Sequence, residues 1–148
     1  GVSDALSIFA TIFKTIVVVT NQQGIGRELM TENDLKRVHD KMLEAISAKG
    51  GRIDAVFYSP DLKNTNSFTR KPAVGLGLKA RKQFPSIRFS KSFMAGDTYN
   101  DILFGHRLGM KTVLIGNDKV ATSKAIDMLD YSFPDLLSFA KFLEQLLK

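Results

Sequence analysis

Helix-forming and strand-forming patterns alternate along this chain of 148 residues, and that alternation constrains its fold more than any other feature. Residues 15–20 read TIVVVT, a β-branched run of strand length that we expect to be buried on both faces. Alternating helices and strands are typical of α/β domains with a parallel sheet. The sequence therefore predicts a Rossmann-like, doubly wound parallel sheet in three α/β/α layers, forming one domain over residues 1–148.

The remaining elements follow from the spacing of the apolar residues. Apolar positions at helical spacing predict helices, and short β-branched runs predict strands. The predicted helices cover residues 5–13, 31–49, 72–83, 100–108 and 136–147, and the predicted strands cover residues 15–20, 53–58, 92–95 and 112–115.

Three polar segments come at the ends of predicted strands or in the connections after them. They are Thr20 with Asn21, Arg70 with Lys71, and Asp97 with Asp101. Doubly wound sheets gather their binding sites at the carboxyl ends of the strands. We therefore treat these segments as the candidate site.

Each of these segments has two interpretations. Asp97 and Asp101 could be an N-cap and a first-turn acid of a helix, or they could bind Mg²⁺, which prefers oxygen ligands. Thr20 and Asn21 could simply end a strand, or they could direct a hydroxyl and backbone N–H groups at a phosphate. Lys71 could be a solvated cation, or it could offset the nearby carboxylates, which would otherwise repel one another. The spacing alone favours the structural interpretation in each case.

Composition excludes some classes of site. The chain has no cysteine, so disulfides, thiolate nucleophiles and zinc–thiolate sites are ruled out. No apolar run is long enough to span a bilayer, and no signal-peptide pattern is present, so we expect a cytoplasmic protein. The net charge of +6 would suit a phosphorylated ligand, but the basic residues are scattered, as on a solubilising surface.

Taken together and in order, the motifs resemble those of a known family. The segments VVVTNQQGIGR (residues 17–27), RKP (residues 70–72) and GDTYNDILFGHRLGMKTVLI (residues 96–115) look like the second, third and fourth motifs of the haloacid dehalogenase (HAD) superfamily. The sequences of these motifs, together with GGRIDAVFYSP at residues 50–60, resemble those of the branch of heptose-bisphosphate and histidinol-phosphate phosphatases.

The resemblance implies a role for each matching residue. Thr20 would hold the transferring phosphoryl group by its hydroxyl, and Asn21 would present its backbone N–H to the substrate. Lys71 would steady the nucleophile and the phosphoryl oxygens, and Arg70 would contact the substrate. The metal ligands would be Asp97, which binds Mg²⁺ directly, and Asp101, which acts as a ligand or orients bound water.

The sequence departs from the family pattern in two places. Members of the family carry a D-x-D nucleophile motif on an early strand, but no D-x-D precedes Thr20. We therefore expect the chain as it stands to lack turnover, and we expect its missing strand to be central in the sheet. The Cys/His zinc loop of the heptose-bisphosphate branch is also absent from residues 59–69, so the substrate within the branch stays open.

The predicted function is Mg²⁺-dependent hydrolysis of a small phosphorylated metabolite through an aspartyl phosphate. A heptose bisphosphate or histidinol phosphate would be such a substrate. The stretch between Asn21 and Lys71 is too short for a large cap domain. We expect a monomer or small homo-oligomer without membrane or nucleic-acid partners. The alternatives are a polynucleotide 3′-phosphatase and, if D-x-D is truly absent, a non-catalytic scaffold.

Overall fold

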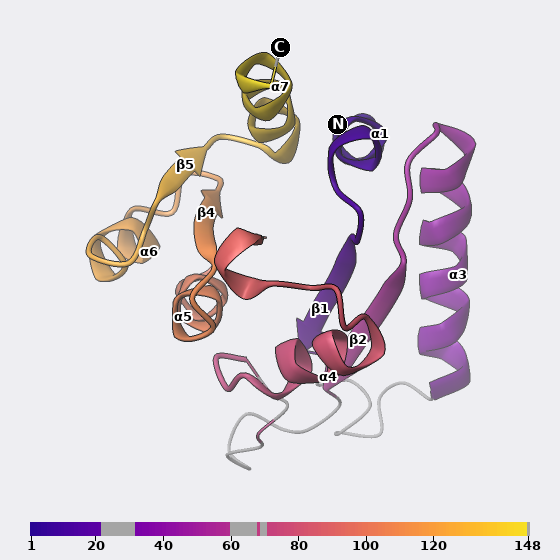
Figure 1. Ribbon diagram of the computed structural model, residues 1–148, viewed down its shortest axis with the longest axis horizontal. Helices are drawn as coiled ribbons and strands as arrows, with labels where there is room; N and C mark the ends of the chain where they lie inside the picture. The colour runs from indigo at the N-terminus through magenta and orange to yellow at the C-terminus, as the bar shows by residue number, and fades with distance from the viewer. Residues whose placement is uncertain (22–31, 60–67, 69–70, 148) are drawn as a thin grey trace.

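The computed structural model describes residues 1–21, 32–59, 68 and 71–147. Its helices and strands alternate as the sequence predicts (Figure 1). They are α1 (Val2–Ile12), β1 (Val17–Asn21), α3 (Glu32–Ala48), β2 (Ala55–Ser59), α4 (Gly75–Gln83), the 3₁₀ turn η2 (Phe89–Lys91), β3 (Phe93–Gly96), α5 (Tyr99–Arg107), β4 (Lys111–Ile115), α6 (Lys119–Lys124), β5 (Tyr131–Phe133) and α7 (Leu136–Leu146).

The strands of the described residues form two separate parallel sheets. β1 pairs with β2, so that Val17 lies opposite Ala55 and Asn21 lies opposite Ser59. The second sheet has the order β3-β4-β5, with β4 in the middle. The predicted α/β fold with parallel strands is confirmed, but the described strands lie in two sheets and not in one.

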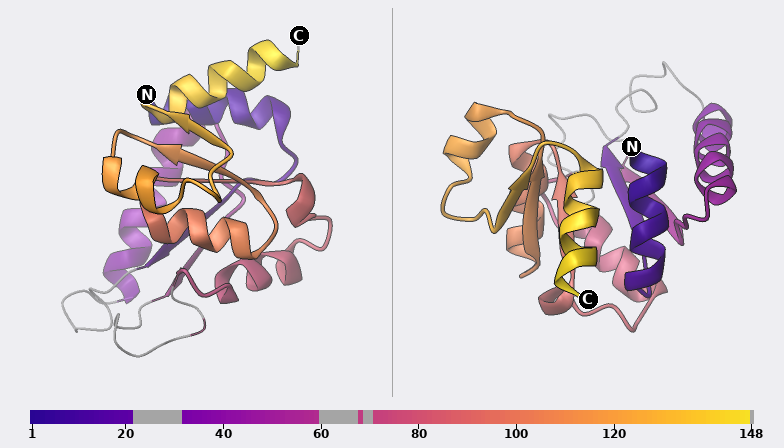
Figure 2. Two further views of the ribbon diagram at one scale, coloured as in Figure 1. Left: turned by 90° about the vertical axis from the view of Figure 1, so that its left-hand side faces the viewer. Right: turned by 90° about the horizontal axis from the view of Figure 1, so that it is seen from above.

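Helices cover both faces of the strands. Figure 1 shows α1 and α7 on one side and α4 and α5 on the other, and Figure 2 shows α1 and α7 side by side. α4 packs against β1 and β2, whereas α5 packs against β3 and β4. The two helix layers therefore flank both sheets, and the middle strand β4 of the second sheet is the most deeply buried.

An aromatic cluster joins the α1–α7 layer to the second sheet. The ring centroids of Phe9 and Phe139 are 5.5 Å apart, and those of Phe93 and Phe139 are also 5.5 Å apart. These tilted and edge-on arrangements are favourable for aromatic pairs. Three elements far apart in the sequence, α1, β3 and α7, are thus held together by large apolar side chains.

Glycine allows α5 to lie close to β3. A Cβ atom built on Gly105 would come within 2.6 Å of the Cβ atom of Met94, which is closer than real side chains approach. Ile102 and Phe104, on the same helix, are almost completely buried. This close packing fixes α5 against β3, and the start of this helix carries part of the candidate site.

The structure corrects several details of the sequence predictions. β1 is half-buried along its whole length and not buried on both faces, because it borders a cavity. The helix expected from residue 72 begins at Gly75. α6 and β5 were not predicted, since six and three residues are too short to show a clear periodicity.

Candidate active site

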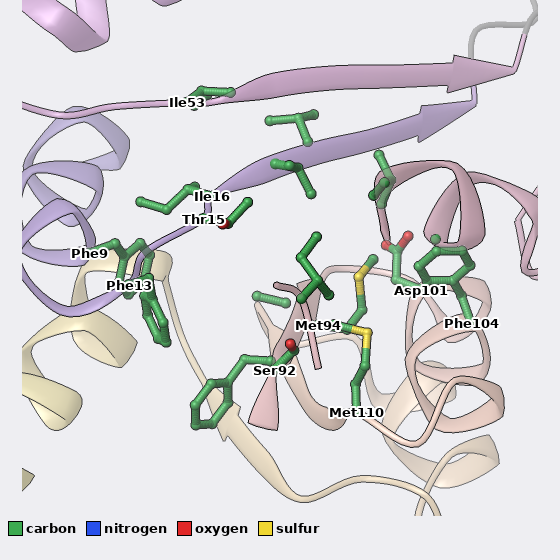
Figure 3. Close-up of a pocket in the computed structure, with 18 of the residues that line it drawn as sticks. Phe9, Phe13, Thr15, Ile16, Ile53, Ser92, Met94, Asp101, Phe104 and Met110 are labelled. Carbon is green, nitrogen blue, oxygen red and sulfur yellow. The ribbon is translucent and has the colours of Figure 1, made fainter. Parts of the chain in front are cut away.

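A cavity of about 660 Å³ lies between the two sheets (Figure 3). One wall comes from β1 and the other from β3, and most of the lining side chains are apolar. The polar lining residues include four that the sequence singles out. These are Thr20, Lys71, Asp97 and Asp101. Residues separated by up to 81 positions in the chain therefore border one cavity.

Lys71 and Asp101 form a buried ion pair at this cavity. The Lys71 Nζ atom lies 2.6 Å from Asp101 Oδ1, and the two side chains are only 11% and 8% exposed. The same ammonium donates a hydrogen bond of 3.0 Å to the backbone carbonyl of Val19 in β1. Burying both charges is tolerable because each has a close partner. The pair also links β1 to the start of α5.

Thr98 holds the second oxygen of the Asp101 carboxylate. Its backbone N–H and its hydroxyl donate to Asp101 Oδ2 at 3.3 and 2.9 Å. The Thr98 hydroxyl in turn accepts from the Asp101 N–H at 3.2 Å, which completes a capping box at the start of α5. The N-cap is therefore Thr98 and not Asp97, which corrects the helix-cap interpretation of that acid. Asp101 is the first-turn acid, as expected.

Gly96 leaves the space that the Asp101 carboxylate occupies. It is the last residue of β3, and a Cβ atom there would overlap the Asp101 side chain. Asp97 follows directly in the loop to α5, and it is exposed at the rim of the cavity. One carboxylate is thus buried and held by neighbours, and the other faces solvent.

Asn21 makes contacts that the sequence did not suggest. Its Oδ1 atom accepts from the Lys71 backbone N–H at 3.0 Å, and its Nδ2 atom donates to the Lys71 carbonyl at 3.3 Å. The resemblance implies only a backbone role for Asn21. No local pattern could have revealed a side-chain contact between residues 50 positions apart.

The other predicted site residues are placed as follows. Thr20 lies near the end of β1, opposite Tyr58 of β2 in the parallel register. Arg70 lies outside the described residues. The roles of Thr20, Asn21, Arg70, Lys71, Asp97 and Asp101 stay predictions.

Asp97 and Asp101 would suit a magnesium ion that takes its other ligands from water and substrate. They would not suit a metal whose ligands all come from the protein. Within residues 1–21, 32–59, 68 and 71–147, no group of three or more His, Cys, Asp or Glu side chains could hold a metal. Mg²⁺ is usually bound by one or two carboxylates, with waters and substrate phosphate completing its shell. An exposed Asp97 beside a fixed Asp101 matches this arrangement.

Known proteins resemble this chain over most of its length. The HAD-hydrolase-like family profile matches residues 68–138. The crystal structure of a D,D-heptose 1,7-bisphosphate phosphatase from Burkholderia thailandensis is 30% identical, with a TM-score of 0.68, and the match covers 99% of this chain and 84% of that one. The chain belongs to the HAD-like hydrolases. The four polar residues at the cavity therefore lie within a HAD-like scaffold.

Two further proteins resemble this HAD-like chain. A D,D-heptose 1,7-bisphosphate phosphatase from B. bronchiseptica, crystallised with magnesium and phosphate, is 25% identical with a TM-score of 0.87, and the match covers 97% of this chain and 81% of that one. A D-glycero-β-D-manno-heptose-1,7-bisphosphate 7-phosphatase from Neisseria meningitidis is 27% identical over 98% of this chain and 80% of its own. Among the described residues, none of the helices combines the length and apolar character needed to cross a bilayer.

Proposed function

We propose that this HAD-like chain carries the active site of a Mg²⁺-dependent phosphatase for a small phosphorylated metabolite. A sugar phosphate such as a heptose bisphosphate is the preferred substrate class, because relatives that match nearly the whole chain are heptose-bisphosphate phosphatases. Histidinol phosphate, which is not a sugar phosphate, is the second candidate metabolite. The observation that carries the proposal is the meeting of Thr20, Lys71, Asp97 and Asp101 at one cavity.

Lys71 supplies fixed positive charge for a phosphate. An ammonium group has three N–H donors. Two of them point to Val19 and Asp101, and the third would serve a phosphoryl oxygen. Because the amine is already held, little reorganisation is needed when substrate binds, and preorganised donors of this kind are worth roughly 10²–10³ in rate.

Thr20 and Asn21 would hold the other phosphoryl oxygens from the end of β1. Thr20 borders the cavity, and Asn21 follows it along the strand. Arg70 would contact the rest of the substrate. Phosphoryl transfer depends mainly on such positioning and on neutralising charge.

The two acids would divide the task of holding magnesium. The exposed Asp97 would bind the ion directly, whereas Asp101, whose oxygens accept from Lys71 and Thr98, would orient bound water. When bound, Mg²⁺ would neutralise the phosphate so that an anionic nucleophile can approach it. The proposed route would transfer the phosphoryl group from the substrate to an aspartate other than Asp97 and Asp101, with release of the substrate alcohol, and water would then hydrolyse the aspartyl phosphate to phosphate.

The test is phosphate release by the intact native protein. Heptose bisphosphate, histidinol phosphate and p-nitrophenyl phosphate would be compared with Mg²⁺ and with EDTA. We expect turnover only with Mg²⁺ and the highest kcat/KM for one of the two metabolites. Absence of Mg²⁺-dependent phosphate release from all three would contradict the proposal.

The charge of one segment supports a second candidate, a polynucleotide 3′-phosphatase. The described stretch from α4 to β3 has no Asp or Glu, and it carries the exposed cations Lys79, Arg81, Lys82, Arg88 and Lys91. Such a segment would attract a polyanion. Binding of single-stranded DNA that weakens steeply with salt, together with release of a 3′-phosphate, would favour this candidate over the metabolite phosphatase.

A further inference from the structure

We propose that the side chain of Asn21 is a positioning residue, which sets Lys71 in place by pairing with the lysine backbone. The effect of Asn21 on catalysis rests on the proposed phosphatase function. The structural part, the fixing of Lys71, stands on the geometry alone.

The contact between the two residues is a closed pair of hydrogen bonds. Asn21 Oδ1 accepts from the Lys71 N–H at 3.0 Å, while Asn21 Nδ2 donates to the Lys71 carbonyl at 3.3 Å. Both bonds are partly buried. A carboxamide used in this way binds both polar groups of one backbone residue and therefore fixes its position and its orientation.

The same edge of β1 also holds the other end of Lys71. Backbone polar groups of alternate residues in a strand point to the same side, so the carbonyl of Val19 and the backbone N–H of Asn21 lie on one edge. Val19 accepts from the Lys71 ammonium at 3.0 Å. The lysine is therefore bound to β1 at its backbone through Asn21 and at its tip through Val19.

Within the described residues, Arg107 of α5 also contacts the chain next to Lys71. Arg107 donates to the carbonyl of Pro72 at 3.3 Å, but this contact is exposed. The Asn21 pair is the better shielded of the two, and it acts on Lys71 itself. Losing it would let the lysine backbone shift, and the contacts of the ammonium with Val19 and Asp101 would then be broken for more of the time.

Only a side chain with one donor and one acceptor can make this pair. Aspartate has nearly the shape of asparagine but has two acceptor oxygens, so Asn21→Asp would place an acceptor against the Lys71 carbonyl. Leucine fills similar space without either group. These two variants remove the pair by different means, so that a result common to both reports on the hydrogen bonds.

The first experiment measures the exposure of Lys71 without using activity. Amine acetylation would be quantified by peptide mass spectrometry in wild type, Asn21→Asp and Asn21→Leu, with the exposed Lys79 as the internal reference. We expect acetylation of Lys71 relative to Lys79 to rise at least about 5-fold in both variants, because the lysine is only 11% exposed in the wild type. Circular dichroism would exclude global unfolding.

The second experiment measures kcat and KM of the same variants of the intact native protein on p-nitrophenyl phosphate. We expect kcat to fall about 10- to 100-fold with KM changed less than about 3-fold, since a shift of roughly 1 Å at a catalytic group can lose that much rate. Gln145→Leu, which removes an exposed carboxamide from α7, is the matched control and should leave both values unchanged.

The outcomes separate this inference from the proposed function. Unchanged Lys71 acetylation in both variants would overturn the positioning role, whatever the activity. Raised acetylation with an unchanged kcat in an active enzyme would also overturn it, because the contact would then be structural only. Raised acetylation in a protein whose wild type releases no phosphate would support the fixing of Lys71 and reject the phosphatase.

Discussion

Two charged residues of the candidate site are buried. Lys71 and Asp101 are both almost fully buried, and each is the other's charge partner. A buried ion pair adds little to stability compared with apolar residues, but loss of one partner leaves an uncompensated charge. Substitutions at these positions therefore affect stability as well as the proposed reaction, and the two effects must be measured separately.

Replacing Lys71 with methionine should abolish turnover while the protein stays folded. Asp101 would keep the two Thr98 donors but lose its cation, so we expect the free energy of unfolding to fall by about 3 kcal/mol. Urea unfolding and Mg²⁺-dependent hydrolysis of p-nitrophenyl phosphate measure the two effects. If the variant keeps at least half of the wild-type kcat, the assigned role of Lys71 is wrong.

Replacing Asp97 with asparagine should separate activity from stability. The side chain is exposed at the cavity rim, so we expect the free energy of unfolding to change by less than about 0.5 kcal/mol. Mg²⁺-dependent turnover should nevertheless be lost, because an amide is a much weaker magnesium ligand than a carboxylate. Wild-type-like hydrolysis by Asp97→Asn would refute the assignment, and Asp127→Asn on another exposed segment is the control.

Replacing Gly96 with alanine should damage the site by crowding. The added methyl group would overlap the Asp101 carboxylate, so either β3 or the start of α5 must move. Overpacking of this kind typically costs about 1–3 kcal/mol of stability. We expect a lower unfolding midpoint in urea and a loss of activity. Gly109→Ala is an unsuitable control because Gly109 has a φ of +78°. Ser90→Ala, at an exposed position before β3, is suitable.

At the scale of elements, sequence periodicity located most of the fold but not its details. The long amphipathic helices and the β-branched strands were found within a few residues of their ends, because burial of one face gives a repeating pattern. α6 and β5 escaped, since they are short and owe their structure to neighbours. The capping of α5 by Thr98 was missed because Asp97, beside it, is an equally good N-cap type.

The N-terminus of α7 should show a measurable pH dependence. Asp135 is its N-cap, and the backbone N–H of Ser138 donates to the carboxylate at 2.7 Å, which lowers the pKa of Asp135 below its ordinary value of 3.8. A carboxyl whose pKa is lower in the folded state stabilises the fold above the unfolded pKa, and this contribution is lost as the pH falls through the folded pKa. The loss therefore begins near pH 3.8 and continues below it.

The variant Asp135→Asn tests this dependence. Asparagine is also a good N-cap but does not titrate, so we expect its unfolding temperature to decline less than that of wild type between pH 5 and pH 2.5. Differential scanning calorimetry across that range gives the comparison. Parallel pH curves for the two proteins would show that the Ser138 contact does not shift the titration of Asp135.

At the scale of the whole molecule, the candidate site depends on the placement of the two sheets on either side of one cavity. Motif order alone predicted that Thr20, Lys71, Asp97 and Asp101 belong together, because parallel strands deliver their carboxyl ends to one edge. It could not predict the Asn21–Lys71 pair, which needs the relative placement of segments 50 residues apart. Local patterns identify the chemistry, and only packing shows which side chains hold it in place.

The edges of β1 and β3 that face the cavity carry a group of backbone N–H and C=O groups. Ile16 accepts from the N–H of Asp54 beside β2, so by alternation Val17 and Val19 direct their polar groups at the cavity. Ser92 accepts from the N–H of Lys111 in β4, so Phe93 and Ala95 direct theirs at the cavity as well. In the part of the chain that the structure describes, β1 pairs only with β2, and β3 pairs only with β4.

Amide hydrogen exchange should therefore be much faster at the cavity-facing strand edges than in the middle of the second sheet. The amides of Val17 and Ala95 should exchange at least about 100-fold faster than that of Val113, which lies in β4 between two strands and is fully buried. Exchange read residue by residue by NMR makes the comparison within one sample. Equal protection of all three amides would mean that the cavity-facing edges are paired in solution, and the two-sheet arrangement would then be wrong. The same measurement with Mg²⁺ and inorganic phosphate would show whether filling the polar end of the cavity alone protects these edges.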